Sequence, residues 1–310
     1  MKDITSKQIS LRTASAEGFV LCSPETIHII RNNALPKGDL FNIAKAAAML
    51  AAKNTSNLIP HCHPVAIEAM DIEFDTLENV GKDEFAAVKI SISAKSIGRT
   101  GIEMEVLTAV SIAALTIYDL LKPVDKNILI SDIRLTEKKG GKTDKKNKVK
   151  PGIKAAILVC SDSTAEGKRE DKSGKIIHEM LSHYKVEIAD YKIIPDEPTS
   201  IQKYVLEWVQ SGVDFIFTTG GTGIDPRDKT IDALVEIFDR EIDGISETMR
   251  AYGQARTPFA MLSRSIAGVI GKSIVIAVPG SSNGARESLE AILPGVFHGR
   301  DMLLGGGHPG

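Results

Sequence analysis

The stretch KKGGKTDKKNKVKPG, residues 138–152, decides the organisation of the fold because it separates two dissimilar halves of the chain. It holds seven lysines and three glycines, and apart from Val149 it has no residue typical of a hydrophobic core. Such a composition is typical of linkers. We therefore expect a lysine-rich linker at residues 143–152, between one domain at residues 1–142 and another at residues 153–310. The first lysines of the stretch could instead line a site on the domain that they leave.

The overall composition is that of an ordinary globular protein. The chain has 310 residues, of which 43% are hydrophobic and 25% are charged, and its formal net charge is −2. At about 100–200 residues per domain, this length predicts two domains. A nearly neutral chain argues against a dedicated nucleic-acid-binding or membrane-surface protein, so we expect no nucleic-acid partner and only local cationic sites.

The cysteines and the N-terminus indicate a cytoplasmic protein. Cys22, Cys62 and Cys160 form no CxxC pair, so they fit neither a disulfide framework nor a four-thiolate zinc site. The N-terminal segment MKDITSKQIS has no apolar stretch after its lysine. The most lipophilic stretch, residues 106–118, is too short to span a bilayer, which takes about 20 residues. We therefore expect no membrane partner.

The first half of the chain mixes two hydrophobic periods. Helical periodicity is seen at residues 23–33, 39–56 and 103–121. The alternation typical of strands is seen at residues 66–77, 85–96 and 127–138. Helices that cross one face of a mostly antiparallel sheet predict an α+β domain, which we expect to be ferredoxin-like.

The second half follows a different pattern. Four short apolar runs each end in polar or glycine residues, with helical segments between them: residues 153–161, 186–195, 213–221 and 273–280. This pattern predicts an α/β doubly wound domain with a mainly parallel sheet, in which ligands bind at the carboxyl ends of the strands.

Residues 58–65, LIPHCHPV, place His61, Cys62 and His63 side by side and raise the question of a zinc site. Adjacent side chains usually point apart, and no second His/Cys pair lies at zinc-finger spacing, so the pattern argues against zinc. A buried cysteine and a hydrogen-bonded histidine are the structural alternative.

Four segments of the first half nevertheless resemble one enzyme family. The segments are PKGDLF (36–41), AAKNTSNLIPHCHPV (51–65), TGIEMEVLTAVSIAALTIYDLLK (100–122) and RLTEKKGGKTD (134–144). Together they resemble the cyclic pyranopterin monophosphate synthase family (MoaC) of molybdenum cofactor synthesis, over residues 3–144. The resemblance implies conversion of 3′,8-cyclo-7,8-dihydro-GTP to cyclic pyranopterin monophosphate and pyrophosphate, with no cofactor firmly implied. It also implies dimers built into hexamers, with sites shared between subunits.

The resemblance implies roles for particular residues. Asp119 and Lys122 share one helical face and match the acid/base centre, although such a pair can also be a plain surface ion pair. We expect crowding by other cations to lower the pKa of Lys122. The cations expected to bind the triphosphate are Arg12, Lys37, Lys53, Lys122, Lys138 and Lys142. Polar contacts are expected from His61, Cys62, His63, Glu103, Met104 and Glu105, of which His63 is the main contact of its loop. Glu103 and Glu105 could instead be first-turn helix residues stabilised by the helix dipole.

A glycine-rich segment dominates the second half. TTGGTGIDPRDKT, residues 218–230, follows a predicted strand, where backbone N–H groups can approach a phosphate. It is not a P-loop, because no Gly-Lys-Ser/Thr follows. It resembles the MogA/MoaB molybdopterin-binding family over residues 153–305, together with VCSDSTAEG (159–167), IIPDEP (193–198), FDREIDGISETMR (238–250), FAMLSRSIAGVIGKSIVIAVPGS (259–281) and SLEAILP (288–294).

The second resemblance implies adenylylation of molybdopterin by Mg-ATP, and trimers, so that three-fold symmetry is compatible with both halves. It implies that Asp196 and Asp228 are catalytic and hold Mg²⁺ or orient the reacting groups. Phosphate is expected at Gly220, Gly221, Thr222 and Gly223, further acidic contacts at Asp162 and Asp171, and the pterin side at Ser263, Pro279 and Gly280.

Alternatives remain for the second half. Asp228 could simply cap a helix, and the domain could be a non-catalytic pterin-binding or oligomerisation module. Ser163 stands where the family often has arginine, and PGSSNGA (279–285) lacks a common proline. The retained Arg227-Asp228 pair favours an active enzyme.

Overall fold

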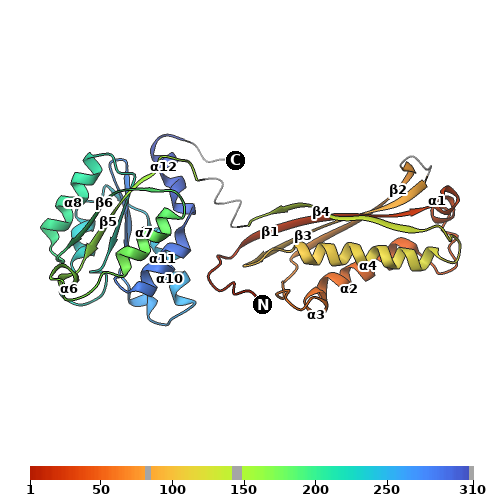
Figure 1. Cartoon of the computed structure of the whole chain (residues 1–310), viewed down its shortest axis with the longest axis horizontal. Coiled ribbons are helices and arrows are strands. Elements are labelled where there is room, and N and C mark those ends of the chain that lie inside the picture. The colour runs from red at the N-terminus through yellow and green to blue at the C-terminus, as the bar shows by residue number, and fades with distance from the viewer. Residues whose placement is uncertain (81–84, 142–148, 307–310) are drawn as a thin grey trace. The chain divides into compact units, whose positions relative to one another are not determined.

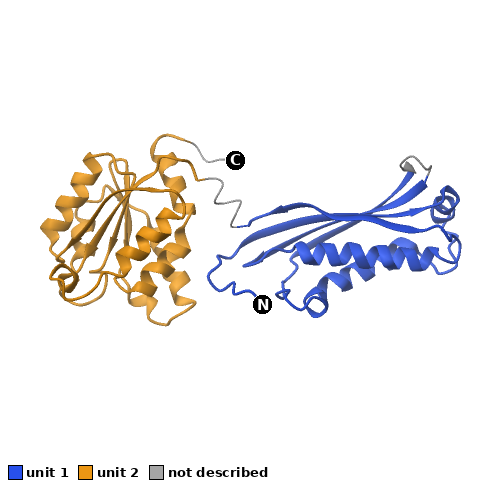
Figure 2. Cartoon of the chain, viewed as in Figure 1, with its two compact units in different colours: residues 1–144 blue, residues 145–310 orange. Residues whose placement is uncertain are grey.

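A computed structural model of the chain divides it into two compact units, residues 1–144 and 145–310 (Figures 1 and 2). The structure describes residues 1–80, 85–141 and 149–306. Most of the predicted linker, residues 143–152, lies outside the described residues, and so does the predicted site residue Lys142. Each unit has its own hydrophobic core.

The N-terminal unit contains an antiparallel sheet of four strands: β1 (Ser10–Cys22), β2 (Ala69–Val80), β3 (Phe85–Gly98) and β4 (Leu129–Lys139). The strand order is β2-β3-β1-β4, so β1 lies inside the sheet. The chain passes from β1 through helices to the β2–β3 pair, and then through one long helix to β4. Each neighbouring pair of strands is antiparallel.

The helices of this unit are α1 (Pro24–Arg31), α2 (Leu40–Lys53), α3 (Thr55–Leu58) and α4 (Glu103–Leu121). α4 packs on the sheet, and α2 packs beside α4 (Figure 1). Small side chains of β1 permit the close approach of α4, since a Cβ at Gly18 would lie 2.7 Å from Cγ1 of Val110. Asp39 begins α2 by accepting a hydrogen bond from the Asn42 amide at 3.1 Å.

Two features of this unit bear on the predictions. β1 is absent from the predicted strands, because its buried positions carry Ala14, Ala16 and Gly18 instead of large apolar side chains. α4 has 19 residues and is long and apolar enough to cross a membrane by length and composition alone. The prediction concerned residues 106–118 alone, and half of the 18-residue apolar window of α4 is buried inside the unit, as in the core helix of a folded domain.

The C-terminal unit contains a mixed, mostly parallel sheet of six strands: β5 (Lys154–Cys160), β6 (Glu187–Ile194), β7 (Phe215–Thr219), β8 (Arg240–Glu241), β9 (Ala267–Ile270) and β10 (Ser273–Val278). The order is β6-β5-β7-β10-β9-β8. β6, β5, β7 and β10 are parallel, as predicted. The apolar runs of β5, β7 and β10 are buried on both faces, whereas β6 lies at the edge and is partly exposed. β9 and β8, which extend one edge antiparallel to their neighbours, are absent from the predicted strands.

Helices cover both faces of this sheet. One core contains Ile177, Met249 and Leu289, and the other contains Val205 and Leu234. The helices are α6 (Asp162–Ala165), α7 (Ser173–Ser182), α8 (Pro198–Gln210), α9 (Thr230–Val235), α10 (Asp243–Gln254), α11 (Ser282–Ile292) and α12 (His298–Leu303), with 3₁₀ helices η1 (Ala260–Leu262) and η2 (Gly295–Phe297). Because four strands are parallel, the segments that follow them meet at one edge of the sheet.

Candidate functional site

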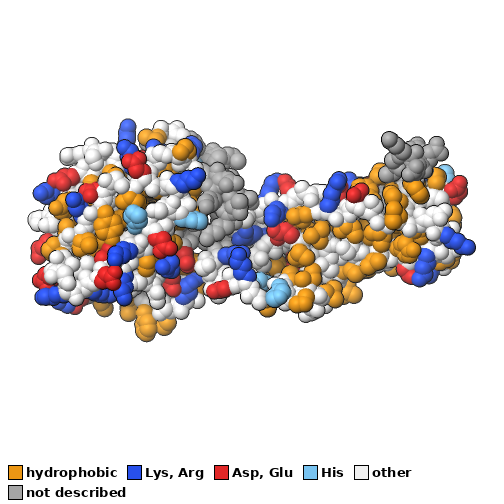
Figure 3. Space-filling view, in the orientation of Figure 1, with side chains coloured by type: hydrophobic (Ala, Val, Ile, Leu, Met, Phe, Trp, Pro, Cys, Tyr) orange, Lys and Arg blue, Asp and Glu red, His pale blue; other side chains and the backbone are white. Residues whose placement is uncertain are grey.

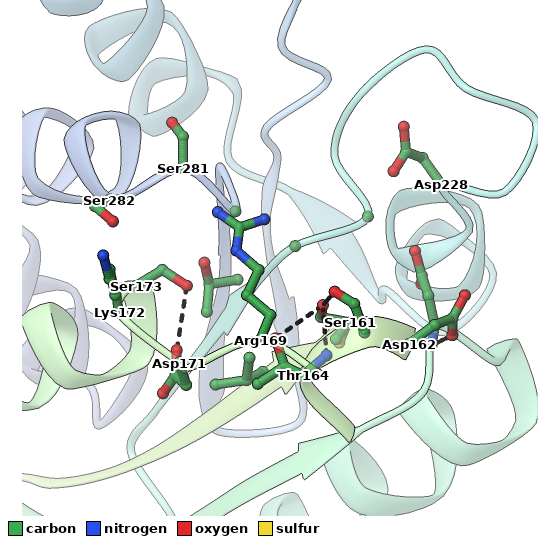
Figure 4. Close-up of a pocket in the computed structure, with 18 of the residues that line it drawn as sticks. Ser161, Asp162, Thr164, Arg169, Asp171, Lys172, Ser173, Asp228, Ser281 and Ser282 are labelled. Atoms are coloured by element: carbon green, nitrogen blue, oxygen red, sulfur yellow. Dashed lines mark hydrogen bonds between the residues drawn. The ribbon is translucent and has the colours of Figure 1, made fainter. Parts of the chain in front are cut away.

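The C-terminal unit has a cleft of about 460 Å³ at the carboxyl ends of its parallel strands (Figure 4). Each wall comes from a segment that follows a strand: Ser161–Thr164 after β5, Asp196 after β6, Gly220 and Gly221 after β7, and Gly280–Ser282 after β10. The fold therefore brings together residues that lie far apart in the sequence.

The glycine-rich turn needs glycine for two reasons. Gly220 has φ +101°, and a Cβ there would lie 2.0 Å from the Cys160 carbonyl oxygen. Gly221 has φ +58°, and its Cβ would lie 2.2 Å from Oδ2 of Asp196. Other residues rarely adopt these angles, and their side chains would collide with the walls of the cleft. The turn thus exposes backbone where a phosphate can approach.

Asp196 is held in place by three hydrogen bonds. Its carboxylate accepts from the Lys229 amide at 3.3 Å and from the Thr230 hydroxyl at 2.9 Å. Its own amide donates to Oδ1 of Asp162 at 3.0 Å. Burial raises the pKa of Asp196, and the negative charges of Asp228 and Asp162 add to the rise. The hydrogen bonds from Thr230 and Lys229 lower this pKa but do not cancel the rise.

Asp228 lines the same cleft and does not cap a helix. α9 begins after Lys229, and no side chain caps its N-terminus. The Asp228 carboxylate instead accepts a hydrogen bond from the Asp225 amide at 3.1 Å. The helix-capping alternative for Asp228 is therefore wrong, because its carboxylate accepts a hydrogen bond within the turn at residues 225–228 and not from α9.

Asp171 also lines the cleft but is buried and occupied by structural contacts. Its carboxylate accepts from the Gly174 amide at 2.9 Å, at the start of α7, and from the Tyr191 hydroxyl. Burial, together with the Asp171 carboxylate, raises the pKa of Tyr191. This aspartate positions α7 beside the cleft.

The remaining predicted residues of the second half fall into three places. Asp162, Asp196, Gly220, Gly221, Asp228 and Gly280 line the cleft together with Ser163 and Arg227. Ser263 and Pro279 line a second cleft of about 470 Å³ between α10 and α11, which shares Ser281 with the first. Thr222 and Gly223 are absent from both linings, although the Thr222 carbonyl accepts from the Arg264 amide at 2.8 Å.

Several cleft residues were not singled out from the sequence: Arg169, Lys172, Ser281 and Ser282. Arg169 and Lys172 belong to a charged run between two helices, which is typical of a solvated surface. Ser281 and Ser282 directly follow β10, so their place at a strand end is the signal that could have indicated them.

The N-terminal unit brings Asp119 together with two lysines at the C-terminal end of α4. Asp119 Oδ1 lies 2.6 Å from Nζ of Lys122, and Oδ2 lies 2.8 Å from Nζ of Lys37. Lys37 also donates to the Asp119 carbonyl oxygen at 2.9 Å. The prediction that Asp119 and Lys122 share a helical face is confirmed.

These ion pairs shift the pKa values of Asp119 and Lys122 in opposite directions. Lys122, and then Lys37, lowers the pKa of Asp119 to about 2. Asp119 in turn raises the pKa of Lys122. The predicted lowering of the Lys122 pKa is therefore wrong for this chain, because the nearest charge to its ammonium group is a carboxylate.

A second cluster lies at the N-terminal end of α4. Cys62 Sγ lies 3.7 Å from Oε1 of the buried Glu105, and within the described part of the chain Oε2 has no hydrogen-bond partner. Burial raises the pKa of Glu105. Nε2 of His63 lies 2.8 Å from the carbonyl oxygen of Lys2. Across all the described ranges, no three His, Cys, Asp or Glu side chains are grouped to hold a metal.

The other predicted residues of the first half have separate environments. Glu103 lies 3.6 Å from Nζ of Lys138, and Met104 is partly exposed. Lys53 and His61 are exposed. Arg12 was predicted to bind phosphate, but it is buried and donates to the carbonyl oxygens of Gly98 and Gly140, so its guanidinium group joins strand ends.

The two clusters are separated within one chain. Glu103 and Asp119 lie 16 residues apart on α4, which corresponds to about 24 Å at 1.5 Å per residue. The predicted site residues of the first half therefore form two groups and not one.

Comparisons with known proteins agree with this division. The MoaC family matches residues 1–141, and a probable molybdopterin binding domain matches residues 156–298. A molybdenum cofactor biosynthesis bifunctional protein of Chlorobaculum tepidum is 44% identical over 308 residues, which cover 99% of this chain and 96% of that protein.

Each half also matches separate proteins. A cyclic pyranopterin monophosphate synthase of Clostridium perfringens is 46% identical over 147 residues, which cover 47% of this chain and 90% of that protein. The crystal structure of the molybdopterin biosynthesis enzyme MoaB from Thermus thermophilus is 43% identical, covers 50% of this chain and 98% of that chain, and has a TM-score of 0.48. Since the likeness to the bifunctional relative spans nearly the full length of both proteins, the chain belongs to the family of bifunctional molybdenum cofactor biosynthesis proteins.

Proposed function

We propose that this chain is a bifunctional, cytoplasmic enzyme of molybdenum cofactor synthesis. Its N-terminal domain, ferredoxin-like and spanning residues 1–142, converts 3′,8-cyclo-7,8-dihydro-GTP to cyclic pyranopterin monophosphate and pyrophosphate. Its C-terminal domain, residues 153–310 after a linker at residues 143–152, adenylylates molybdopterin with Mg-ATP. The observation that carries this proposal is the 44% identity to a bifunctional relative over 99% of the chain.

In the N-terminal reaction, Lys122 is the proton donor and Asp119 orients it. The raised pKa of Lys122 keeps its amine protonated at neutral pH, so that a proton is available for transfer. A pKa near the working pH favours that transfer, so a donor role requires the pKa of Lys122 to fall when substrate binds. Asp119 stays ionised because two lysines contact it, and Lys37 supplies a further cation for the triphosphate. His63, Cys62 and Glu105 bind the polar base and ribose.

A second copy of the chain completes the N-terminal site. Glu105 and Asp119 lie 14 residues apart on α4, which corresponds to about 21 Å at 1.5 Å per residue, and this is too far for one nucleotide to contact both. A neighbouring copy that places its Glu105 cluster beside the Asp119 cluster would solve this problem. We therefore infer a homo-oligomer, with three-fold symmetry compatible with both units.

Exposed apolar side chains support this assembly. They gather over α2 and α4 on the visible face of the N-terminal unit (Figure 3). The exposed fraction is 65% at Leu50 and 55% at Leu115. Side chains of this kind stabilise contacts between subunits by leaving water. Light scattering of the purified chain tests the assembly, and a monomer at micromolar concentration would contradict it.

In the C-terminal reaction, the two clefts bind the two substrates. Backbone N–H groups at Gly220 and Gly221 bind phosphate of ATP in the first cleft. Ser263 and Pro279 bind the pterin in the second cleft. Ser281 belongs to both linings, which supports a path between the substrates. An oxygen of the molybdopterin phosphate attacks the α-phosphorus of ATP, and pyrophosphate leaves with the electron pair of the broken bond.

Asp196 and Asp228 are the residues that would hold Mg²⁺. This ion prefers carboxylate oxygens and usually combines one or two carboxylates with substrate phosphates and water. The donor set fits, because burial and neighbouring carboxylates raise the pKa of Asp196 and a cation would relieve that repulsion. Bound Mg²⁺ would neutralise charge on the phosphates. Asp162 orients Asp196 by accepting its amide hydrogen at 3.0 Å.

The test is to incubate the purified chain with molybdopterin and Mg-ATP and to follow adenylylated pterin and pyrophosphate by mass spectrometry. We expect Asp228→Asn to lower the rate by at least about 100-fold. Asp232→Asn is the matched control, because Asp232 pairs with Arg264 outside the cleft. If the parent forms no product but still makes cyclic pyranopterin monophosphate, the C-terminal unit is a pterin-binding or assembly module.

A further inference from the structure

The segment between β5 and α7, together with the first turn of α7, carries four cations, which divide into two kinds. Lys168 lies 2.6 Å from Glu166, and Lys175 lies 2.7 Å from Glu170, so both are neutralised locally. Arg169 and Lys172 line the first cleft, and within the described ranges neither forms a salt bridge. Lys172 also acts on Glu170 at longer range, because its charge contributes to the lowered pKa of that carboxyl. The two cations without a salt bridge are therefore the two that line the cleft.

The third cation of the cleft is already paired. Nε of Arg227 lies 3.2 Å from Oδ1 of Asp225, in its own turn. Six carboxylates line the same cleft: Asp162, Glu170, Asp171, Asp196, Asp225 and Asp228. A polyphosphate would be repelled by this excess of negative charge unless cations on the chain offset part of it.

The backbone of Arg169 is fixed while its side chain reaches into the cleft. The amides of Lys168 and Arg169 donate to the Ser163 carbonyl oxygen at 2.9 and 3.1 Å. In Figure 4 the guanidinium group extends from this segment toward Ser281, away from Asp171. An anchored backbone limits the entropy that the side chain loses when it binds an anion.

We infer that Arg169 is a specificity-determining residue that binds a phosphate group of the substrates, with Lys172 as a second cation on the same wall. A planar guanidinium group can donate two parallel hydrogen bonds to one phosphate. The inference rests on the proposed adenylyl transfer and adds to it the residue that faces the phosphates opposite the aspartates. The phosphate belongs either to the nucleoside triphosphate or to the phosphate monoester of the pterin.

Steady-state kinetics of the full chain separates the two sources. Arg169→Ala should raise the KM for one substrate by about 10- to 100-fold, and Arg169→Lys should recover part of that loss. A raised KM for ATP assigns the nucleotide, and a raised KM for molybdopterin assigns the pterin phosphate. The matched control is Lys168→Ala, which removes a neighbouring cation that lies outside the cleft. Equal KM values in Arg169→Ala and Lys168→Ala would overturn the inference.

A direct binding measurement keeps the inference testable if adenylyl transfer is absent. Calorimetry with inorganic pyrophosphate and Mg²⁺ as the probe should show about 10- to 100-fold weaker binding to Arg169→Ala than to Lys168→Ala. Equal binding by the two variants, or no binding by the parent chain, would overturn the inference. Weaker binding without any adenylylated product would retain Arg169 as a phosphate-binding residue and refute only the proposed reaction.

Discussion

The hydroxyl of Thr230 donates to Oδ1 of Asp196 across 2.9 Å. Thr230 is fully buried at the first position of α9, whereas Asp196 follows β6. One hydrogen bond therefore joins two segments that are 34 residues apart in the sequence. It fixes the carboxylate proposed to hold Mg²⁺ to the helix that follows the glycine turn.

Replacing Thr230 with Val should lower the free energy of unfolding of the C-terminal unit by about 1–3 kcal/mol, because Asp196 loses a buried donor. Adenylyl transfer should fall as well, since the carboxylate is then less well positioned. Urea unfolding of the full chain measures the first effect. Thr230→Ser retains the hydroxyl and is the control. A valine variant as stable as the parent would show that the bond contributes nothing.

Replacing Gly220 with Ala should distort the phosphate-binding turn. The new Cβ would lie 2.0 Å from the Cys160 carbonyl oxygen, in a backbone conformation with φ +101°. Gly212→Ala is the matched control, because Gly212 has φ +77° and no atom within 4 Å of its Cβ position. It should cost only about 1–2 kcal/mol of conformational strain. Equal decreases in the melting temperature of the two variants would refute the steric explanation.

Replacing Lys122 with Ala should lower kcat for cyclic pyranopterin monophosphate formation by about 10²–10⁴-fold, the usual contribution of a general acid. The melting temperature should stay unchanged, because more than half of the Lys122 side chain is exposed. The matched control is Lys126→Ala, which removes an exposed lysine just beyond the same helix. Retained turnover in the Lys122 variant would exclude it as the proton donor.

Asp125 should make the stability of the N-terminal unit depend on acid pH. Burial alone would raise its pKa, but hydrogen bonds from the Ser23 and Asn127 amides and the Thr26 hydroxyl, each at 2.8 Å, outweigh burial and lower it. A lowered pKa means that the ionised carboxylate stabilises the folded unit at pH values above about 3.9, the pKa of aspartate in the unfolded chain. This contribution is lost as the pH falls through the folded pKa.

The matching experiment follows unfolding between pH 7 and pH 2. Asp125→Asn should destabilise the unit by about 1–3 kcal/mol at pH 7, because its amide group cannot accept all three hydrogen bonds. The difference from the parent should shrink below pH 4. Asp71→Asn, which changes an exposed carboxylate on β2, is the control. A difference that persists unchanged at pH 2 would exclude titration of Asp125 as its origin.

Much of the fold could be predicted because its elements have strong local patterns. The helix at residues 103–121 matches α4, and the four short apolar runs of the second half match parallel strands. β1 was missed because small residues occupy its buried positions beneath α4. β8 and β9 were missed because strands of two and four residues are too short to show a period.

The candidate sites were less predictable than the fold. The glycine turn and its aspartates belong to recognisable motifs, but Arg169 lies in a charged run that resembles an ordinary surface. Its position in the cleft becomes evident only when α7 packs beside β5. The predicted direction of the Lys122 pKa shift was wrong. Crowding by other cations was expected to lower this pKa, whereas the nearby Asp119 carboxylate raises it.

The sequence by itself determined the division into two units, the types of most helices and strands, and local pairs such as Asp119 and Lys122. These follow from composition and from the 3.6- and 2-residue periods, which act over short distances along the chain. Only the tertiary structure decided that Lys37 reaches Asp119 from 82 residues away, and that Arg169 lines the cleft of Asp196 and Asp228. Such contacts depend on how whole helices and strands pack, and local sequence patterns do not specify this packing.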